Sequence, residues 1–436
     1  PATKEPVDAV AAATITANFR AQAMAMADSF HGGFGDGPKF PSVPQLVALI
    51  ELDAHSPDAE TAEFIADTLD KMAARGLRDR LGGGFFRYTV DVEWRVPHFE
   101  KMLYDNAQLA RAYLRAAEVY DNDRWRLVAF DTLDFMRREL WRDTGAFIAS
   151  LSAVDADDVE GGYYLWTDAE LDRLLDSQER TIARLSLGFG GPSALEHGML
   201  PTDAAPATQV AERLKLSVQA AQTRIDSIVG KLNAERERRN LPVDDKLLAG
   251  WNGLALSALS AAVRAPDGQR FAASAEPLGH FLTDRLWNGK TLSRAARAGG
   301  SAALEDYALV ARGLVDWYMT TQAMKDLETD NSRLLEVALD VARRALDDFH
   351  SDGGWRLGAG SLIPMAPGEA LIGDVSLPSA SATLLGAALD AARLAGDSAF
   401  EQRVLAIVSI GSERLQQAPY LYATQVTLLN GSANRR

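Results

Sequence analysis

Apolar residues recur at every third or fourth position through most of the chain, the pattern of amphipathic helices that pack on a core. The pattern predicts thirteen helices, at residues 7–28, 43–55, 58–78, 98–119, 123–140, 167–187, 208–236, 250–264, 268–286, 303–322, 332–349, 380–396 and 398–415. Runs typical of strands are few and short, and GGFFRYTV, GAFIASLSA and GGYYLW are the clearest. Because strands do not alternate regularly with helices, the pattern argues against a doubly wound sheet and predicts an all-α fold.

The connecting segments repeat one plan, at residues 28–41, 78–91, 140–153, 284–295 and 347–361. In each, a helix ends, one or two glycines follow, and an aromatic or apolar residue precedes polar ones. Glycine after a helix supplies the left-handed cap, and a repeated style of helical hairpin indicates an internally repetitive fold.

Hairpins of this kind fit either an open α-solenoid or a closed toroid of about six hairpins. Solenoid connections are usually short and bland, whereas these loops are long, glycine-rich, aromatic and charged. Loops of that kind carry function on a rigid scaffold. The prediction is therefore one (α/α)6 toroid over residues 1–436, with these loops lining one mouth.

Composition narrows the classes of ligand. The chain has 436 residues, 47% of them hydrophobic, which is enough for a large core, and a net charge of −15. That charge argues against nucleic acid and an anionic membrane surface as partners, and favours a neutral or cationic small ligand. The lack of cysteine excludes disulfides, thiolate nucleophiles and cysteine-bound zinc.

The sequence also leads to expectations about the cellular location and about a longer parent protein. No apolar run approaches the length of a membrane span and no signal peptide is visible, so a cytoplasmic location is expected. Because the chain begins with Pro1, we expect a trimmed piece of a longer protein, with residues 1–7 as a linker remnant.

The stretch from residue 88 to residue 114 crowds ionisable groups at a predicted helix start. Pro97 suits a first turn, so His98 and Asp105 are expected on one face, two turns apart. Lys101 lies between them, and Glu100 and Tyr104 form an i,i+4 pair. This pattern is typical of a proton-handling site, with His98 as base and Glu100 or Asp105 tuning it. The alternative is a solvated helix start, with acids near the positive end of the dipole. The neighbouring side chains predicted to contact substrate are Arg87, Tyr88, Trp94, Lys101, Tyr104 and Asn106.

Four further clusters stand at comparable places in other hairpins. Residues 154–166 carry acids and aromatics but lack the later positions of a calcium loop, so a polar pocket is favoured over a cation and no metal site is predicted. Residues 243–259 fit ligand contact as well as a helix cap with a core tryptophan. Residues 304–310 and 373–389 begin two more helices with acids and with serines. The residues singled out are Asp155, Asp157, Tyr164, Trp166, Asp245, Lys246, Trp251, Asn252, Glu305, Asp306 and Tyr307.

These clusters predict a concave polar pocket if they converge from around a ring. Aromatic rings stack on the C–H faces of sugars, and carboxylates and amides bind their hydroxyls. The predicted partner is therefore a small carbohydrate, and no cofactor is predicted.

The same segments resemble a known family. GGGFFRYTVDVEWRVPHFEKMLYDNAQL, VDADDVEGGYYLWT, VDDKLLAGWNGLAL and LEDYALV are similar, in this order, to motifs of the YyaL-like family, the thioredoxin-domain proteins related to spermatogenesis-associated protein 20. GGFGDGPKFP also matches the family pattern. The resemblance covers essentially the whole chain, and the run from Val96 to Asn106 is its most specific part.

The resemblance implies a toroid of six-hairpin glycosidase type, similar to those of sugar 2-epimerases and certain glycoside hydrolases. In that family a thioredoxin-like domain precedes the toroid, so such a domain is expected as a partner in the full-length protein. Two departures stand out. Asp158 replaces the usual serine in a segment that is shorter here, and residues 378–382 lack the family's asparagine, which puts a contact at this loop in doubt.

Two reactions fit a carbohydrate-processing toroid. Epimerisation or isomerisation needs one or two bases of near-neutral pKa, with His98 first and His31, His197 or His350 as the second. Glycoside hydrolysis needs two carboxylates: Asp105 with Glu305 or Asp306, or Asp155 as a substitute. The alternative function is a non-catalytic scaffold that binds a glycan or a protein. A third reading is redox regulation by a separate thioredoxin-like partner that docks on the acidic surface.

Overall fold

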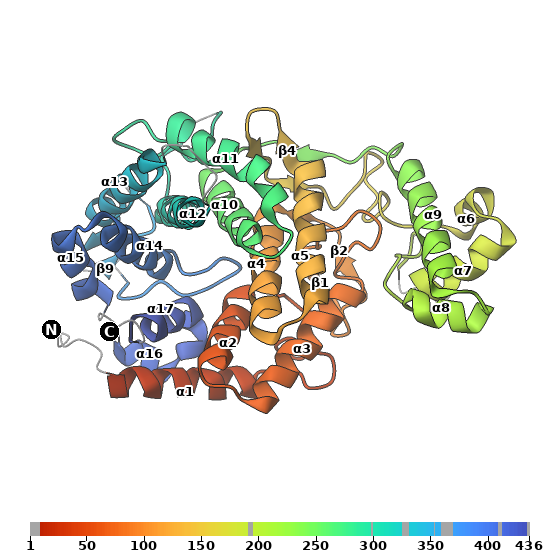
Figure 1. The fold of residues 1–436 in the computed structure, drawn as a ribbon, viewed down its shortest axis with the longest axis horizontal. Helices are drawn as coiled ribbons and strands as arrows, with labels where there is room; N and C mark the ends of the chain where they lie inside the picture. Colours follow the sequence, from red (N-terminus) through yellow and green to blue (C-terminus); the bar gives the residue numbers. More distant parts are fainter. Residues whose placement is uncertain are drawn as a thin grey trace.

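The computed structural model describes residues 9–190, 195–297, 300–324, 331–352, 354–358, 369–408 and 412–433. Within these residues, six helices form an inner ring in which each helix packs on the next and the last returns to the first (Figure 1). In ring order they are α2 (Val43–His55), α4 (Leu103–Tyr120), α10 (Ala249–Arg264), α12 (Leu304–Ala323), α14 (Ala380–Ala395) and α17 (Ala423–Ala433). This closed ring confirms the predicted toroid.

The outer helices each pack on an inner neighbour and alternate with the inner ones along the chain. They are α1 (Ala9–Ala25), α3 (Ala59–Ala74), α5 (Asp123–Phe135), α11 (Ala272–His280), α13 (Ser332–Phe349) and α15 (Ser398–Val408). Single-turn π-helices continue α5 at Met136–Leu140 and α11 at Phe281–Leu286, and 3-10 turns lie at Gln269–Phe271 and Pro419–Tyr422. In the part of the chain that is described, no helix combines the length and the apolarity that a membrane span requires.

Inner helices are buried on two sides, so their packing needs small residues. A Cβ at Gly253 of α10 would lie 2.4 Å from the Leu309 carbonyl oxygen of α12. A Cβ at Gly313 of α12 would lie 2.4 Å from the Gly253 carbonyl oxygen. The two backbones therefore approach each other where both helices carry glycine, and larger side chains would separate them.

Several predicted helix boundaries are wrong. The helix predicted from residue 98 begins at Leu103, because the residues before it pair as strands. β2 (Pro97–His98) pairs with β1 (Tyr88–Thr89), and β3 (Lys101–Met102) pairs with β6 (Ser150–Leu151), which also pairs with β7 (Val243–Asp244). The remaining short strands are β4 (Trp141–Arg142) with β5 (Ala146–Phe147) and β8 (His350–Ser351) with β9 (Gly354–Trp355). His98 and Asp105 therefore do not share a helix face.

Two long predicted helices divide, and one helix was not predicted. The helix at 167–187 is α6 (Asp168–Leu174) and α7 (Ser177–Leu187), separated where Asp176 caps α7. The helix at 208–236 is α8 (Ala207–Leu214) and α9 (Val218–Arg236), separated at Lys215, whose φ is 54°. Within residues 398–415 the structure describes α15 and the start of α16 (Ser412–Gln417), and α17 is the unpredicted helix. Local capping chemistry outweighs apolar periodicity at these breaks.

Helices α6 to α9 form a lobe beside the toroid, at the right of Figure 1. The lobe has its own hydrophobic cluster, which includes Trp166, Leu171, Ile182, Val210 and Ile228. Its last helix, α9, returns the chain to the toroid through β7, which extends the sheet of β3 and β6.

A loop crosses the ring before α14. We call residues 371–379 the strap. The Gln108 amide of α4 donates to the Ser376 carbonyl of the strap at 3.0 Å, and the Asp374 N–H donates to the Leu421 carbonyl at 2.8 Å. Because α4 and α14 are opposite each other in the ring, the strap spans it, as the blue loop that reaches α4 shows in Figure 1.

Candidate functional site

The inner helices begin at one face of the ring, which we call the mouth. Inner and outer helices alternate along the chain, so the inner ones run in the same direction. Contacts between their first turns agree: Asp306 of α12 accepts a hydrogen bond from the Gly250 N–H of α10 at 3.2 Å. The rings of Tyr104 in α4 and Trp251 in α10 meet edge to face with centroids 4.8 Å apart. The predicted convergence of loops and helix starts at one mouth is therefore present.

Five predicted site residues gather at the start of α4, and we call them the mouth cluster: Arg87, His98, Glu100, Tyr104 and Asp105. The Arg87 guanidinium binds the Glu100 carboxylate at 3.1 Å, and His98 Nε2 lies 3.9 Å from the same carboxylate. Arg87, Glu100 and His98 are half-buried, whereas Tyr104 and Asp105 are only 4% and 7% exposed. Charged groups thus stand at the surface of the cluster and a carboxyl lies beneath them.

Asp105 is the unusual member of the mouth cluster. Burial raises its pKa well above the ordinary value; Arg87 opposes this and Glu100 adds to it. Its Oδ2 is buried and has no hydrogen-bond partner among the described residues. Burial and the neighbouring Asp105 also raise the pKa of Tyr104 to about 12. Asp105 is therefore a buried carboxyl whose raised pKa favours its protonated form, beside the Glu100 side chain, an arrangement suited to proton donation.

An aromatic stack extends from the mouth cluster towards solvent. His98 stacks on Tyr88 with centroids 5.2 Å apart, and Tyr88 stacks on Phe40 at 4.6 Å and 13°. Glu160 Oε1 holds His98 Nδ1 at 2.9 Å. Phe40 is 45% exposed and Glu160 is also exposed. Neither was among the predicted site residues, although Phe40 ends the GGFGDGPKF run that the family resemblance had drawn attention to.

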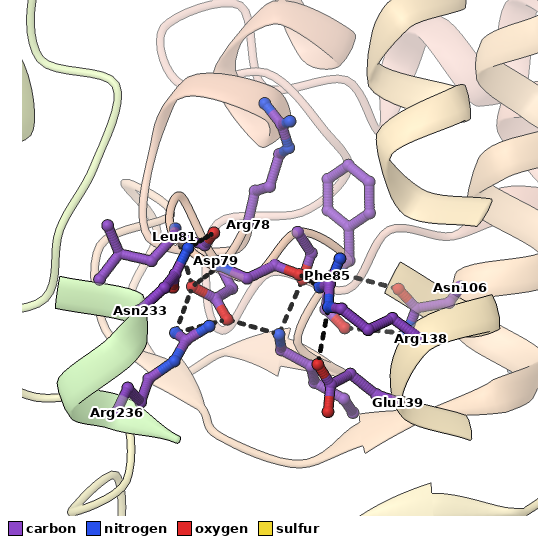
Figure 2. A network of polar contacts seen from close by, with 12 residues as sticks. Arg78, Asp79, Leu81, Phe85, Asn106, Arg138, Glu139, Asn233 and Arg236 are labelled. Atoms are coloured by element: carbon purple, nitrogen blue, oxygen red, sulfur yellow. Dashed lines mark hydrogen bonds and ion pairs between the residues drawn. The ribbon is translucent and has the colours of Figure 1, made fainter. Parts of the chain in front are cut away.

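Lys101 points away from the mouth cluster, into a buried ionic network. Its ammonium binds Asp79 Oδ2 at 2.7 Å, and Arg236 of α9 binds the same carboxylate at 2.9 Å. Figure 2 shows Asp79 beside Arg236, with the lobe helix and the toroid loop meeting there. The rings of Phe86, Phe135 and Tyr164 surround the ammonium at 4.4–5.1 Å. Burial lowers the pKa of Lys101 to about 8, against the attraction of Asp79.

Two predicted contact residues, Asn106 and Asn252, serve the backbone instead. The Asn106 amide accepts from the Phe85 N–H at 2.7 Å and donates to the Phe85 carbonyl at 3.0 Å. The Asn252 amide makes the same pair with Phe147, at 2.9 and 3.0 Å. Each asparagine also donates to the carbonyl four residues earlier, which clamps a glycine-aromatic loop to the start of an inner helix. These contacts give a physical reason for two of the repeated glycine-aromatic loops: each one is fixed to an inner helix by an asparagine amide.

Several other predicted residues are likewise engaged within the fold. Asp306 caps α12 through the Ala303 N–H at 2.9 Å, and the Tyr307 hydroxyl accepts from the Leu292 N–H at 3.0 Å. Trp94 is buried and donates to the His31 carbonyl at 2.9 Å. Trp166 is buried beneath Arg239, with 4.2 Å between its ring and the guanidinium. Their positions are those of structural residues.

The remaining predicted residues lie apart from the mouth cluster or at its edge. Asp155 accepts from the N–H groups of Asp157 and Val159, which forms a tight turn, and Asp157 is exposed. Tyr164 is fully buried, Asp245 is exposed, and the exposed Lys246 pairs with Asp244 at 2.8 Å.

Glu305 is the remaining carboxylic acid that was predicted to be catalytic. It is half-buried at the start of α12, and burial and Asp306 raise its pKa. The histidines suggested as second bases are dispersed. His31 binds Asp28, His197 is exposed, and the ring of His350 packs on Trp355.

The described residues also contain a cavity of about 510 Å³ inside the ring, lined by all six inner helices. None of the predicted site residues is among its lining residues. In the same part of the chain, no group of three or more histidine or acidic side chains is placed to hold a metal ion.

Comparison with curated proteins finds relatives named spermatogenesis-associated protein 20. The chain is 30% identical to human spermatogenesis-associated protein 20 over 459 residues, covering 92% of this chain and 56% of the human protein. It is 32% identical to the mouse protein of that name, covering 69% of this chain and 43% of the mouse protein. The chain therefore spans about half the length of the curated relatives it matches. No family model matches the chain.

Solved structures share the fold at low sequence identity. An alpha-mannanase of Bacteroides thetaiotaomicron matches with a TM-score of 0.55 and 9% identity, covering 97% of this chain and 96% of that one. A D-mannose isomerase matches with a TM-score of 0.54 and 12% identity, covering 93% and 86%. Cellobiose 2-epimerase of Bacillus thermoamylovorans matches with a TM-score of 0.53 and 10% identity, covering 91% and 86%. These likenesses confirm the six-hairpin, glycosidase-like toroid. With relatives aligned along nearly its whole length, the chain belongs to the family of spermatogenesis-associated protein 20.

Proposed function

We propose that the chain binds a small carbohydrate at the mouth cluster and acts on it by acid–base chemistry. The observation that carries this proposal is the buried Asp105, next to Glu100 at the mouth of a toroid: its Oδ2 has no hydrogen-bond partner among the described residues, and burial raises its pKa. Three solved proteins that share the toroid act on or convert sugars according to their names. That likeness supports the choice of carbohydrate, and the residues of this chain supply the chemistry.

The roles follow from position and charge. Asp105 would donate its proton to a sugar oxygen, and Glu100 would accept a proton from water or from a substrate hydroxyl. The Arg87 guanidinium binds the Glu100 carboxylate at 3.1 Å and fixes its position. Tyr88 and Phe40 would provide ring faces for the sugar. In an epimerisation, His98 would be the base, with Glu100 and Glu160 fixing its ring.

The test is sugar binding and turnover by wild type and by Asp105→Asn, with Asp245→Asn as the control because Asp245 is an exposed aspartate outside the mouth cluster. Monosaccharides, disaccharides and sugar phosphates would be screened by thermal shift, since a ligand raises the melting temperature by mass action. Hits would be followed by NMR for hydrolysis or epimerisation. We expect a sugar hit and turnover that Asp105→Asn loses and Asp245→Asn keeps.

Other outcomes separate the alternatives. Sugar binding without turnover in wild type would favour the non-catalytic scaffold. Binding and turnover that survive in Asp105→Asn would remove the mouth cluster from the mechanism. No hit with a well-folded protein would refute the proposal and direct the search to a protein partner, including a thioredoxin-like domain of the full-length protein.

A further inference from the structure

The central cavity is separate from the mouth cluster. On α4, α10 and α12 its lining begins at Ala107, Leu254 and Leu309, about one helical turn beyond Tyr104, Trp251 and Glu305. The strap crosses the ring at this level, where Gln108 binds Ser376 and Pro378 lines the cavity. The volume of about 510 Å³ falls within the roughly 300–1,000 Å³ of small-molecule sites.

The cavity has an apolar floor and a polar, open end. Leu254, Leu309 and Ala382 lie near the strap and are at most 6% exposed. Glu51, His55, Arg111, Arg393 and Asn430 lie further along the inner helices. Arg111 is exposed although it stands in the middle of α4, so solvent reaches that depth of the ring. A ligand entering from this end would meet charge first and apolar surface last.

The charges at the open end are paired, with one exception. Arg115 binds Glu51 at 2.8 Å, Arg312 binds Asp390 at 2.7 Å, and Arg393 binds Glu401 at 2.7 Å. Asp316, which lies within electrostatic reach of Arg111, is bound by Arg312 at 2.8 Å.

Arg111 itself has no hydrogen-bond or ion-pair partner in the described part of the chain. Tyr120 ends α4 more than two turns beyond it, so the negative end of the helix dipole does not reach this guanidinium. A guanidinium without a protein partner inside a cavity offers a place for an anionic group of a ligand.

We propose that this cavity is a second binding site, for an amphipathic monocarboxylate. Its apolar chain would cover Leu254, Leu309 and the other floor residues, and its carboxylate would pair with Arg111. Guanidinium and carboxylate match in shape and form two parallel hydrogen bonds. Leu254, Leu309 and Ala382 offer a hydrocarbon chain apolar surface to cover, and a ligand with such a chain differs in class from the sugar proposed for the mouth cluster. The proposal does not depend on the mouth being catalytic.

The experiment is calorimetric titration of the whole chain with octanoate, with octan-1-ol and octylammonium as probes of equal chain length and different charge. Two variants address the two halves of the ligand. Arg111→Gln removes the charge. Gly386→Phe fills the cavity, because a Cβ at Gly386 meets only Leu428 Cδ1, at 3.6 Å. Arg393→Gln is the matched control, since this lining arginine already has a partner.

We expect octanoate to bind at one site and octylammonium not to bind. Arg111→Gln should weaken octanoate by about tenfold or more, the size expected for a charged hydrogen bond. Arg393→Gln should stay within about twofold of wild type. Gly386→Phe, if it melts like wild type, should abolish binding, and Arg111→Gln decides the matter if it does not fold.

Four results would overturn the proposal. They are no heat with octanoate, equal binding of octan-1-ol or octylammonium, unchanged affinity in Arg111→Gln, and displacement of octanoate by a sugar that binds the mouth cluster. The last would mean that mouth and cavity are one site.

Discussion

Asp79→Asn should be the most destabilising conservative change near the lobe. The Asp79 carboxylate is 2% exposed and accepts from Lys101 at 2.7 Å, from Arg236 at 2.9 Å, and from the N–H groups of Leu81 and Gly82 at 3.0 and 3.1 Å. Asparagine keeps the shape and removes the charge. Two cations would then remain in a site that is closed to water, surrounded by the rings of Phe86, Phe135 and Tyr164.

The magnitude follows from burial. Removing one partner from a buried ion cluster costs about 3–5 kcal/mol. For cooperative unfolding of 436 residues, an entropy of about 2.1 cal/mol/K per residue amounts to about 0.9 kcal/mol/K. The melting temperature should therefore fall by about 3–6 °C. Because Arg236 belongs to α9, the lobe should also become easier to cleave by protease at residues 167–236.

The control for this change is Asp131→Asn. Asp131 of α5 pairs at 2.7 Å with Arg78, the residue before Asp79. Because Asp131 is 45% exposed, loss of its charge should cost less than about 1 kcal/mol. Urea unfolding and limited proteolysis of both variants are the assays. Free energies of unfolding for the two variants within about 1 kcal/mol of each other would refute the reasoning, because burial would then not set the cost.

Two further changes test other parts of the structure. Asp105→Asn should stabilise the protein relative to wild type as pH rises above about 4. In wild type the folded carboxyl keeps its proton because its pKa is raised, whereas the unfolded carboxyl loses its proton near pH 3.8. The folded state of wild type therefore loses stability as pH rises above that value. Melting curves from pH 4 to pH 8 check this, and parallel curves for both proteins would contradict it. Asn252→Ala should cost about 2–5 kcal/mol because it leaves the buried Phe147 N–H and two carbonyls unpaired. Denaturant unfolding measures that cost against Asn288→Ala, at an exposed turn, which should change stability by less than about 1 kcal/mol.

The mouth cluster shows how far motif reasoning reached. Arg87, His98, Glu100, Tyr104 and Asp105 were singled out because ionisable groups were dense within a short segment, and the structure brings them together. The reason given for their proximity, a common helix face, is wrong. Pairing of residues 97–98 with 88–89, and of 101–102 with the distant 150–151, places them, and such short pairings leave no periodic signal.

Lys101 and the two clamping asparagines show the converse. Their side-chain types at a helix start suit a ligand as well as an internal partner. The choice depended on Asp79, Phe85 and Phe147, which lie 22, 21 and 105 residues along the chain from the side chains they bind. It also depended on Arg236, which binds the same Asp79 carboxylate. The cavity beneath the strap left no local signal either, because single residues from six helices line it.

The sequence by itself determined the class of fold, since helix periodicity and glycine caps are local properties that each segment carries in its own residues. It also determined where charge and aromatic rings would gather, because the loops before the inner helices hold them in consecutive positions. Only the tertiary structure decided which of those groups bind partners within the protein and which do not. Closing the ring buries Lys101 against Asp79 and Asn252 against Phe147, and it leaves Asp105 Oδ2 without a hydrogen-bond partner among the described residues. Desolvation is a property of the assembled ring, so the raised pKa of Asp105 exists only once distant helices have met.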